Sequence, residues 1–188
     1  MRKDDSNNLN FQNLRDEQNG PSETYILEPG NVLIPDSNIA VVTVIASSVV
    51  VTIYDVELRR GGVCHFIRPL PEEDQAPTPL FGLPAVVALM NGFISLGSDV
   101  KDLRANIYGG AWPAWANVRQ REIARGNVEI SRDAILKKKI SIHDEDVGGR
   151  RGRKLIYLSG TDEVAIIKTT QVRKSDWFPP LPDSEGAK

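Results

Sequence analysis

The sequence is short of the residues that build redox and metal sites. Its 188 residues include one cysteine and two histidines, which excludes an internal disulfide and a cysteine-rich zinc site. It also lacks an apolar run long enough to span a membrane, and its first residues have no apolar core of the signal-peptide kind. These absences predict a cytoplasmic, soluble protein with no metal, no cofactor and no membrane insertion.

An excess of positive charge is missing too. The 23 Lys and Arg residues are outnumbered by 25 Asp and Glu residues, giving a formal net charge of -2, so nucleic-acid binding is not expected. Glycine doublets stand at 61–62, 109–110 and 148–149, but none is followed by Lys-Ser or Lys-Thr. A phosphate-binding loop is therefore not predicted, and the doublets indicate tight turns or a close approach of backbones.

The length suits one domain with a substantial core. Residues 1–24 are rich in Asn, Asp, Gln and Arg and are predicted to be a flexible polar tail. The folded domain is expected over 25–170. Residues 171–188 form a tail rich in proline and aromatic residues, which could fold back over the domain or act as an extended docking peptide.

Hydrophobic patterning predicts a mixed α/β protein. The β-branched runs at 39–45 and 49–55 indicate strands buried on both faces. One helix is expected from Pro84 to Gly97 and a second from a cap at Asn127 to Lys139. Further strands are expected at 25–27, 32–34, 62–66, 103–108, 140–142, 154–158 and 164–167.

Ser47 and Ser48 interrupt the two longest predicted strands, at a junction expected to lie inside the core. They could be small residues at a bend, hydrogen-bonded to backbone. Alternatively Ser48 could be a nucleophile, because strand pairing could bring it within reach of His65, and a nucleophile needs such a base. Cys64 points to the opposite face of its strand from His65 and is interpreted as a core residue.

Two other clusters leave alternatives open. The basic run at 150–154 could bind phosphate, but Asp144, Glu145 and Asp146 lie just upstream, which favours a solvated hairpin tip. Trp112 and Trp115 follow a predicted strand end and could line a protein-binding groove or simply cover the core.

In combination, these segments resemble the CheD family, chemotaxis proteins that deamidate glutamine side chains of chemoreceptors. The likeness extends over about 25–168, and its landmarks keep their order and spacing. They are Tyr-Asp at 54–55, Gly-Gly-Val-Cys-His-Phe at 61–66 with Pro69, Ile-Tyr-Gly-Gly-Ala at 107–111, Asn-Val-Glu at 127–129, Glu-Asp-Val-Gly-Gly at 145–149 and Gly-Arg-Lys at 152–154.

The resemblance implies a fold, a site and partners. The implied fold is a three-layer α/β/α sandwich with a mixed β-sheet. The implied site holds cysteine, histidine and threonine: the thiolate attacks the glutamine carboxamide, and histidine acts first as base and then protonates the departing ammonia. The implied partners are a methyl-accepting chemoreceptor or a CheC-type phosphatase.

Several residues depart from the family's pattern. The histidine carries over to His65, whereas the family's cysteine falls on Ser48 and its threonine on Val42. Thr43 is one position away and, in a strand, faces the opposite side from Val42. Two family glycines fall on Val44 and Ala46, which narrows the backbone conformations near the reacting atom.

These departures predict a CheD-like signalling protein with weakened or lost activity and a retained protein-binding role, since a hydroxyl is a far weaker nucleophile than a thiol. The alternative is an active amidohydrolase with Ser48 as nucleophile and His65 as base.

Overall fold

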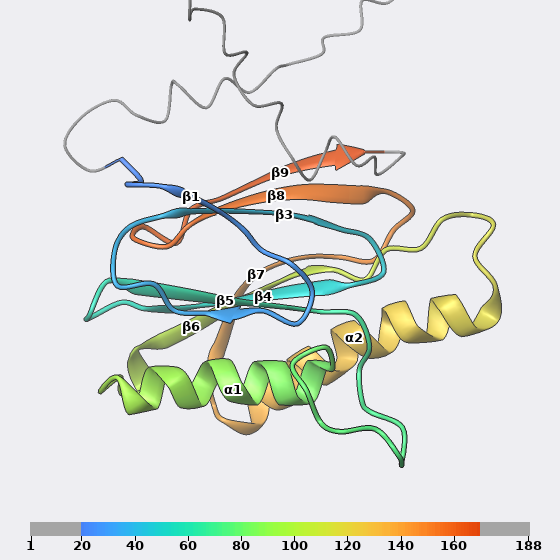
Figure 1. The fold of residues 1–188 in the computed structure, drawn as a ribbon, viewed down its shortest axis with the longest axis horizontal. Coiled ribbons are helices and arrows are strands. Elements are labelled where there is room, and N and C mark those ends of the chain that lie inside the picture. Colours follow the sequence, from blue (N-terminus) through green and yellow to red (C-terminus); the bar gives the residue numbers. More distant parts are fainter. Residues whose placement is uncertain (1–19, 170–188) are drawn as a thin grey trace, which may run out of the picture.

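The computed structural model describes residues 20–169, which form two β-sheets and a pair of α-helices (Figure 1). The predicted N-terminal tail over 1–24 lies almost wholly outside these residues, and the C-terminal tail over 171–188 lies entirely outside them. Sheet A has the strand order β1 (Thr24–Ile26), β3 (Ala40–Ile45), β8 (Gly152–Leu158) and β9 (Val164–Thr169). Sheet B has the order β2 (Val32–Leu33), β5 (Arg60–Phe66), β4 (Val49–Asp55), β6 (Leu103–Gly109) and β7 (Ser141–Val147).

Both sheets are mixed. In sheet A, β1 pairs with β3 in parallel and β3 pairs with β8 antiparallel. In sheet B, β6 and β7 are parallel, whereas β4 is antiparallel to both β5 and β6. The mixed α/β class expected from the sequence is confirmed.

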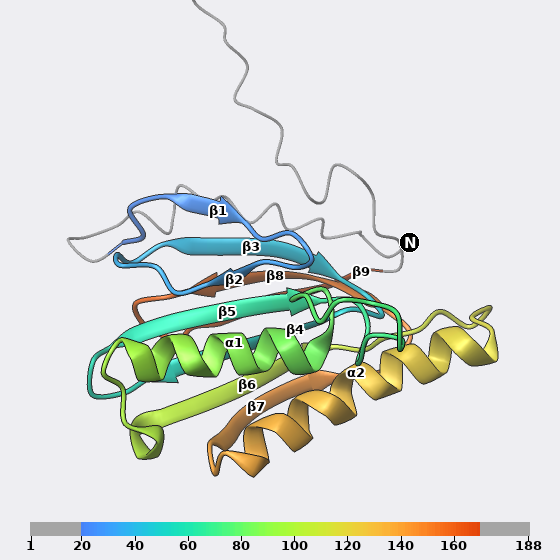
Figure 2. The same cartoon turned by 60° about the horizontal axis from the view of Figure 1, so that its bottom comes forward.

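Helices α1 (Gly82–Ser95) and α2 (Val118–Lys137) cover one face of sheet B, and sheet A covers its other face (Figures 1 and 2). The layer order is therefore helices, sheet B, sheet A. Within residues 20–169, sheet A occupies the place that a second helical layer would have in the expected α/β/α sandwich. In sheet A, β3 comes from the β-branched run at 39–45. Strand β8 pairs with β3, and β9 pairs with β8.

Sheet B is buried on both faces because each face packs against a different layer. Every residue of β4 is buried. Val49, Val51 and Ile53 belong to the core shared with the helices, whereas Val50 belongs to the core between the sheets. This double burial explains the lack of apolar and polar alternation in the sequence.

Helix α2 begins well before Asn127, the expected first residue. Its N-cap is Asn117, whose side chain accepts a hydrogen bond from the Gln120 backbone, while the Gln120 side chain bonds the Asn117 backbone in return. The first turns of α2 are largely exposed and polar, so they show little apolar periodicity in the sequence. Asn127 is instead a fully buried residue inside the helix.

Candidate functional site

The chain passes from sheet A to sheet B at residues 46–48, between β3 and β4 (Figure 1). This confirms that Ser47 and Ser48 lie at a strand junction. They are less buried than expected, because the crossing runs over the end of the two sheets: Ser47 is exposed and Ser48 is partly buried.

All three carbonyl oxygens of this turn accept hydrogen bonds. The donors are Ala111 N for Ala46 O at 2.7 Å, Asn127 Nδ2 for Ser47 O at 2.9 Å and Gly110 N for Ser48 O at 3.0 Å. The contacts come from the segment after β6 and from α2, so two other parts of the chain hold the backbone around Ser48 in place.

Gly109 and Gly110 permit this close approach. Their φ angles are +121° and +64°, which side-chain-bearing residues rarely adopt. A Cβ atom on Gly109 would overlap the carbonyl oxygen of Ser48, and one on Gly110 would overlap the Val128 side chain. The close backbone approach predicted for this doublet is confirmed.

His65 is completely buried between the two sheets. Its Nδ1 lies 3.2 Å from Thr43 Oγ1, and that hydroxyl donates to Leu27 O at 2.8 Å. Because the hydroxyl proton points to Leu27, Oγ1 is the acceptor for Nδ1–H, which makes Nε2 the basic nitrogen. Burial lowers the pKa of His65 to about 4, against the opposing effect of a backbone hydrogen bond at Leu27, so the imidazole is neutral near pH 7.

Thr43 faces His65 and Val42 does not form this contact. Thr43 lies on the same face of β3 as Val41 and Ile45, which both belong to the core between the sheets. The sequence placed Thr43 on the opposite face from Val42, and in the structure that face carries the contact with His65. The arrangement depends on two sheets facing each other, which the strand pattern alone does not reveal.

Ser48 and His65 lie at the same end of sheet B without being joined. His65 is opposite Val50 in the pairing of β4 with β5, and Ser48 immediately precedes β4. Ser48 is partly exposed in the turn, whereas His65 is fully buried and its Nδ1 lies against Thr43. Ser48 would need a change in the turn, or an added bridging molecule, to use His65 as a base.

Cys64 lies on the helix-facing side of β5 and belongs to the core formed with the helices. It is fully buried, and burial raises the pKa of its thiol to about 12. The expected core role of Cys64 is therefore confirmed. Burial keeps its thiol protonated and away from solvent.

Asn127 also belongs to the candidate site, a role that the sequence did not predict. Its Nδ2 donates to Ser47 O at 2.9 Å and to Ile67 O at 3.0 Å, so it connects the turn before β4 to the segment after β5. No local pattern in the sequence predicts this role, because the two carbonyl oxygens that Asn127 bonds belong to distant parts of the chain.

Replacing Asn127 by alanine is expected to lower the free energy of unfolding by about 2 kcal/mol, because two carbonyl oxygens lose a buried donor. Chemical denaturation measures the change. The control is Glu129→Ala on the exposed side of α2, which removes only a solvent-exposed ion pair with Arg125 and should have little effect. Equal effects of the two substitutions would contradict the positioning role of Asn127.

The neutral, buried His65 predicts a stability that falls in acid. Its pKa is lowered from 6.5 to about 4 in the folded chain, so between these values the unfolded chain binds the extra proton. Stability is complete above pH 6.5 and is lost as the pH falls towards 4, by about 3 kcal/mol in total. Denaturation midpoints over this range should show the loss in native protein and in the exposed His143→Gln control, but much less in His65→Gln. An unchanged slope in His65→Gln would contradict the assignment.

Residues 20–169 contain no group of three or more His, Cys, Asp and Glu side chains placed to hold a metal ion. Neither described helix is both long enough and apolar enough to cross a membrane.

Comparison with known proteins identifies relatives along most of the chain. A sequence model of the family described as CheD chemotactic sensory transduction matches residues 69–168, a range that begins after His65. A "Probable chemoreceptor glutamine deamidase CheD 1" of Anaeromyxobacter dehalogenans is 34% identical over 138 residues, which is 73% of this chain and 80% of the relative. A "Probable chemoreceptor glutamine deamidase CheD" of Trichlorobacter lovleyi is 30% identical over 151 residues, 80% of this chain and 94% of the relative. The chain belongs to the CheD family.

Proposed function

We propose that this chain is a chemotaxis signalling protein that binds a methyl-accepting chemoreceptor and whose glutamine deamidase activity is weakened or lost. The receptor partner is suggested by the names of its relatives. A cytoplasmic location belongs to the same proposal, since a lone cysteine buried as a thiol suits a reducing compartment. A CheC-type phosphatase is a second partner consistent with a binding role.

The observation that carries the proposal is the different placement of Ser48 and His65: Ser48 is partly exposed in the turn, whereas His65 is fully buried between the sheets. A serine hydroxyl is almost fully protonated near neutral pH and attacks an amide only when a base within hydrogen-bond reach removes its proton. Ser48 occupies the position that the family resemblance assigns to the nucleophilic cysteine, while Nδ1 of His65 lies against Thr43. The low pKa of His65 also makes it a weak base.

The alternative is an active amidohydrolase, which one feature favours: His65 is neutral and is oriented by Thr43. In this reaction Ser48 Oγ would attack the carboxamide carbon and His65 would accept the hydroxyl proton. The proton would pass to the departing nitrogen as the C–N bond breaks and ammonia leaves. Water would then hydrolyse the ester, giving glutamate and restoring Ser48.

A receptor fragment that contains glutamines in its methylation region tests both functions. Binding is measured by titration calorimetry, and conversion of glutamine to glutamate is followed by peptide mass spectrometry. We expect binding without conversion beyond that of the fragment alone. Conversion by native protein that is lost in His65→Ala would favour the amidohydrolase, whereas absence of binding would contradict the receptor-binding proposal.

A further inference from the structure

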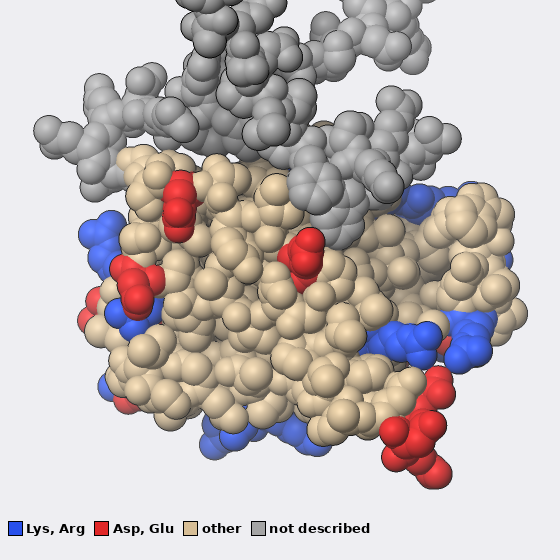
Figure 3. All heavy atoms as spheres, viewed as in Figure 1, with Lys and Arg blue, Asp and Glu red and all other residues tan. Residues whose placement is uncertain are grey.

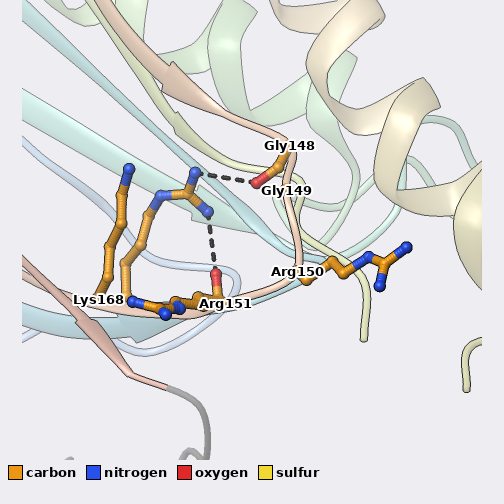
Figure 4. A pocket seen from close by; sticks show the side chains of 6 residues that line it. Gly148, Gly149, Arg150, Arg151 and Lys168 are labelled. Carbon is orange, nitrogen blue, oxygen red and sulfur yellow. Dashed lines mark hydrogen bonds between the residues drawn. The ribbon is translucent and has the colours of Figure 1, made fainter. Parts of the chain in front are cut away.

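The crossing between the sheets at residues 148–151, from β7 to β8, lies beside the Ser48 turn. Gly148 N donates to Gly109 O at 2.8 Å, and Ile45 pairs with Arg153 where the two crossings meet. A pocket of about 350 Å³ opens at the 148–151 crossing (Figure 4). Its lining residues are Gly148, Gly149, Arg150, Arg151, Arg153 and Lys168.

Two of the three acidic residues just upstream, Asp144 and Glu145, bond to groups outside this pocket. Glu145 forms two 2.8 Å hydrogen bonds with Arg132 of α2, and Asp144 accepts a hydrogen bond from Tyr108 at 3.1 Å. Asp146 alone among the three forms ion pairs with the pocket, at 2.8 Å to Arg153 and 3.1 Å to Lys168. One carboxylate thus faces four basic side chains.

These basic residues have different tasks. Arg153 is buried, and its guanidinium donates to the carbonyl oxygens of Gly148 and Arg151 as well as to Asp146, so it holds the turn. Arg150 and Arg151 are exposed, and neither has an ion-pair partner within residues 20–169. In Figure 4 Arg150 points out of the turn, away from Lys168. Arg150 and Arg151 are therefore placed to meet a ligand.

The ligand chemistry follows from which groups of the turn are already used. Gly148 N is bonded to Gly109 O, and Gly149 O accepts from Trp112 N at 3.0 Å. The turn presents the exposed guanidinium groups of Arg150 and Arg151, which form charge-assisted hydrogen bonds with carboxylates. The net charge of -2 disfavours a nucleic acid.

A protein segment could contact this pocket and the Ser48 turn together. Trp112 is bonded to the glycine turn, and Trp115 in the same loop is 77% exposed, as aromatic residues at protein interfaces often are before binding. Figure 3 shows basic and acidic side chains around the edges of the molecule and few charges in the middle of this face. The Trp112 to Trp115 loop thus brings an exposed aromatic side chain beside the glycine turn of the pocket.

We propose that the basic pocket at 148–151 binds an acidic segment of the protein that docks on the Ser48 turn. The proposal deepens the receptor-binding function and rests on it for the identity of the partner. The chemistry of the pocket itself does not depend on that identity. Arg150 and Arg151 make the contacts, and Arg153 positions them.

A fluorescent oligoglutamate peptide tests the pocket without a receptor. We expect it to bind native protein, to bind more weakly as salt is added, and to lose about tenfold in affinity in the double variant Arg150→Glu with Arg151→Glu. The matched control reverses Lys137 and Lys138, two exposed cations at the end of α2, with the same change in net charge. Circular dichroism verifies folding of both variants.

Three results would overturn the proposal: no peptide binding, equal losses in the two double variants, or tighter binding of inorganic phosphate or a single-stranded oligonucleotide. The receptor fragment is titrated separately. If the oligoglutamate peptide binds at Arg150 and Arg151 but the receptor fragment does not bind at all, the pocket is supported and the receptor function fails. If the receptor binds equally well to native protein and to the Arg150 and Arg151 variant, the pocket proposal fails alone.

Discussion

Replacing Ser48 by cysteine is expected to raise the rate of glutamine conversion in a receptor fragment by about 100-fold or more. A thiol is partly ionised near neutral pH and is intrinsically more nucleophilic than a hydroxyl, so it depends less on His65 as a base. Ser48 is partly accessible and its carbonyl is fixed by Gly110 N, so the new thiol would occupy a defined place beside the exposed Ser47.

The neighbouring serine offers a matched control. Ser47→Cys adds a thiol one residue away in the same turn, and this variant should remain as inactive as native protein. Combining Ser48→Cys with His65→Ala should leave part of the gained activity, because a thiol ionises without the help of a base. Equal activities of the two cysteine variants would contradict the assignment of Ser48 to the nucleophile's position.

Replacing Gly109 by alanine is expected to lower the free energy of unfolding by about 4 kcal/mol. Two costs combine at this position: a φ of +121° that is almost restricted to glycine, and an overlap between the new Cβ and the Ser48 carbonyl oxygen. The displaced turn should also weaken receptor binding, since the Ser48 carbonyl is part of the hydrogen-bonded junction.

Gly148→Ala separates the two costs. Gly148 has a φ of +70°, but a Cβ there would meet no atom within 4 Å, so its substitution carries backbone strain alone, about 1 kcal/mol. Urea unfolding of the two variants gives the comparison. Similar losses would mean that the contact between Gly109 and Ser48 is not tight, and would weaken the case that this doublet fixes the turn.

Local patterns predicted many of the elements. The β-branched runs became β3 and β4, Pro84 lies in the first turns of α1, and the Gly109 doublet marks a close backbone approach. These features depend on side-chain shape and backbone freedom, which are properties of short segments.

Features that depend on distant contacts were harder to predict. That β3 and β4 belong to different sheets could not be read from their similar composition, and this division brings Thr43 to His65. Likewise, Asn127 bonds to Ile67 and Ser47, which lie 60 and 80 residues away in the sequence. The partners of the acidic run before β8 were equally hidden in the sequence, since Glu145 bonds to Arg132 of α2.

The most direct measurement is peptide mass spectrometry of a receptor fragment after incubation with the native chain, at protein concentrations where calorimetry detects binding. We expect the bound fragment to keep its glutamines, while the Ser48→Cys variant converts them to glutamate under the same conditions. Conversion by the native chain that disappears in His65→Ala would contradict weakened or lost catalysis and identify Ser48 with His65 as a working pair.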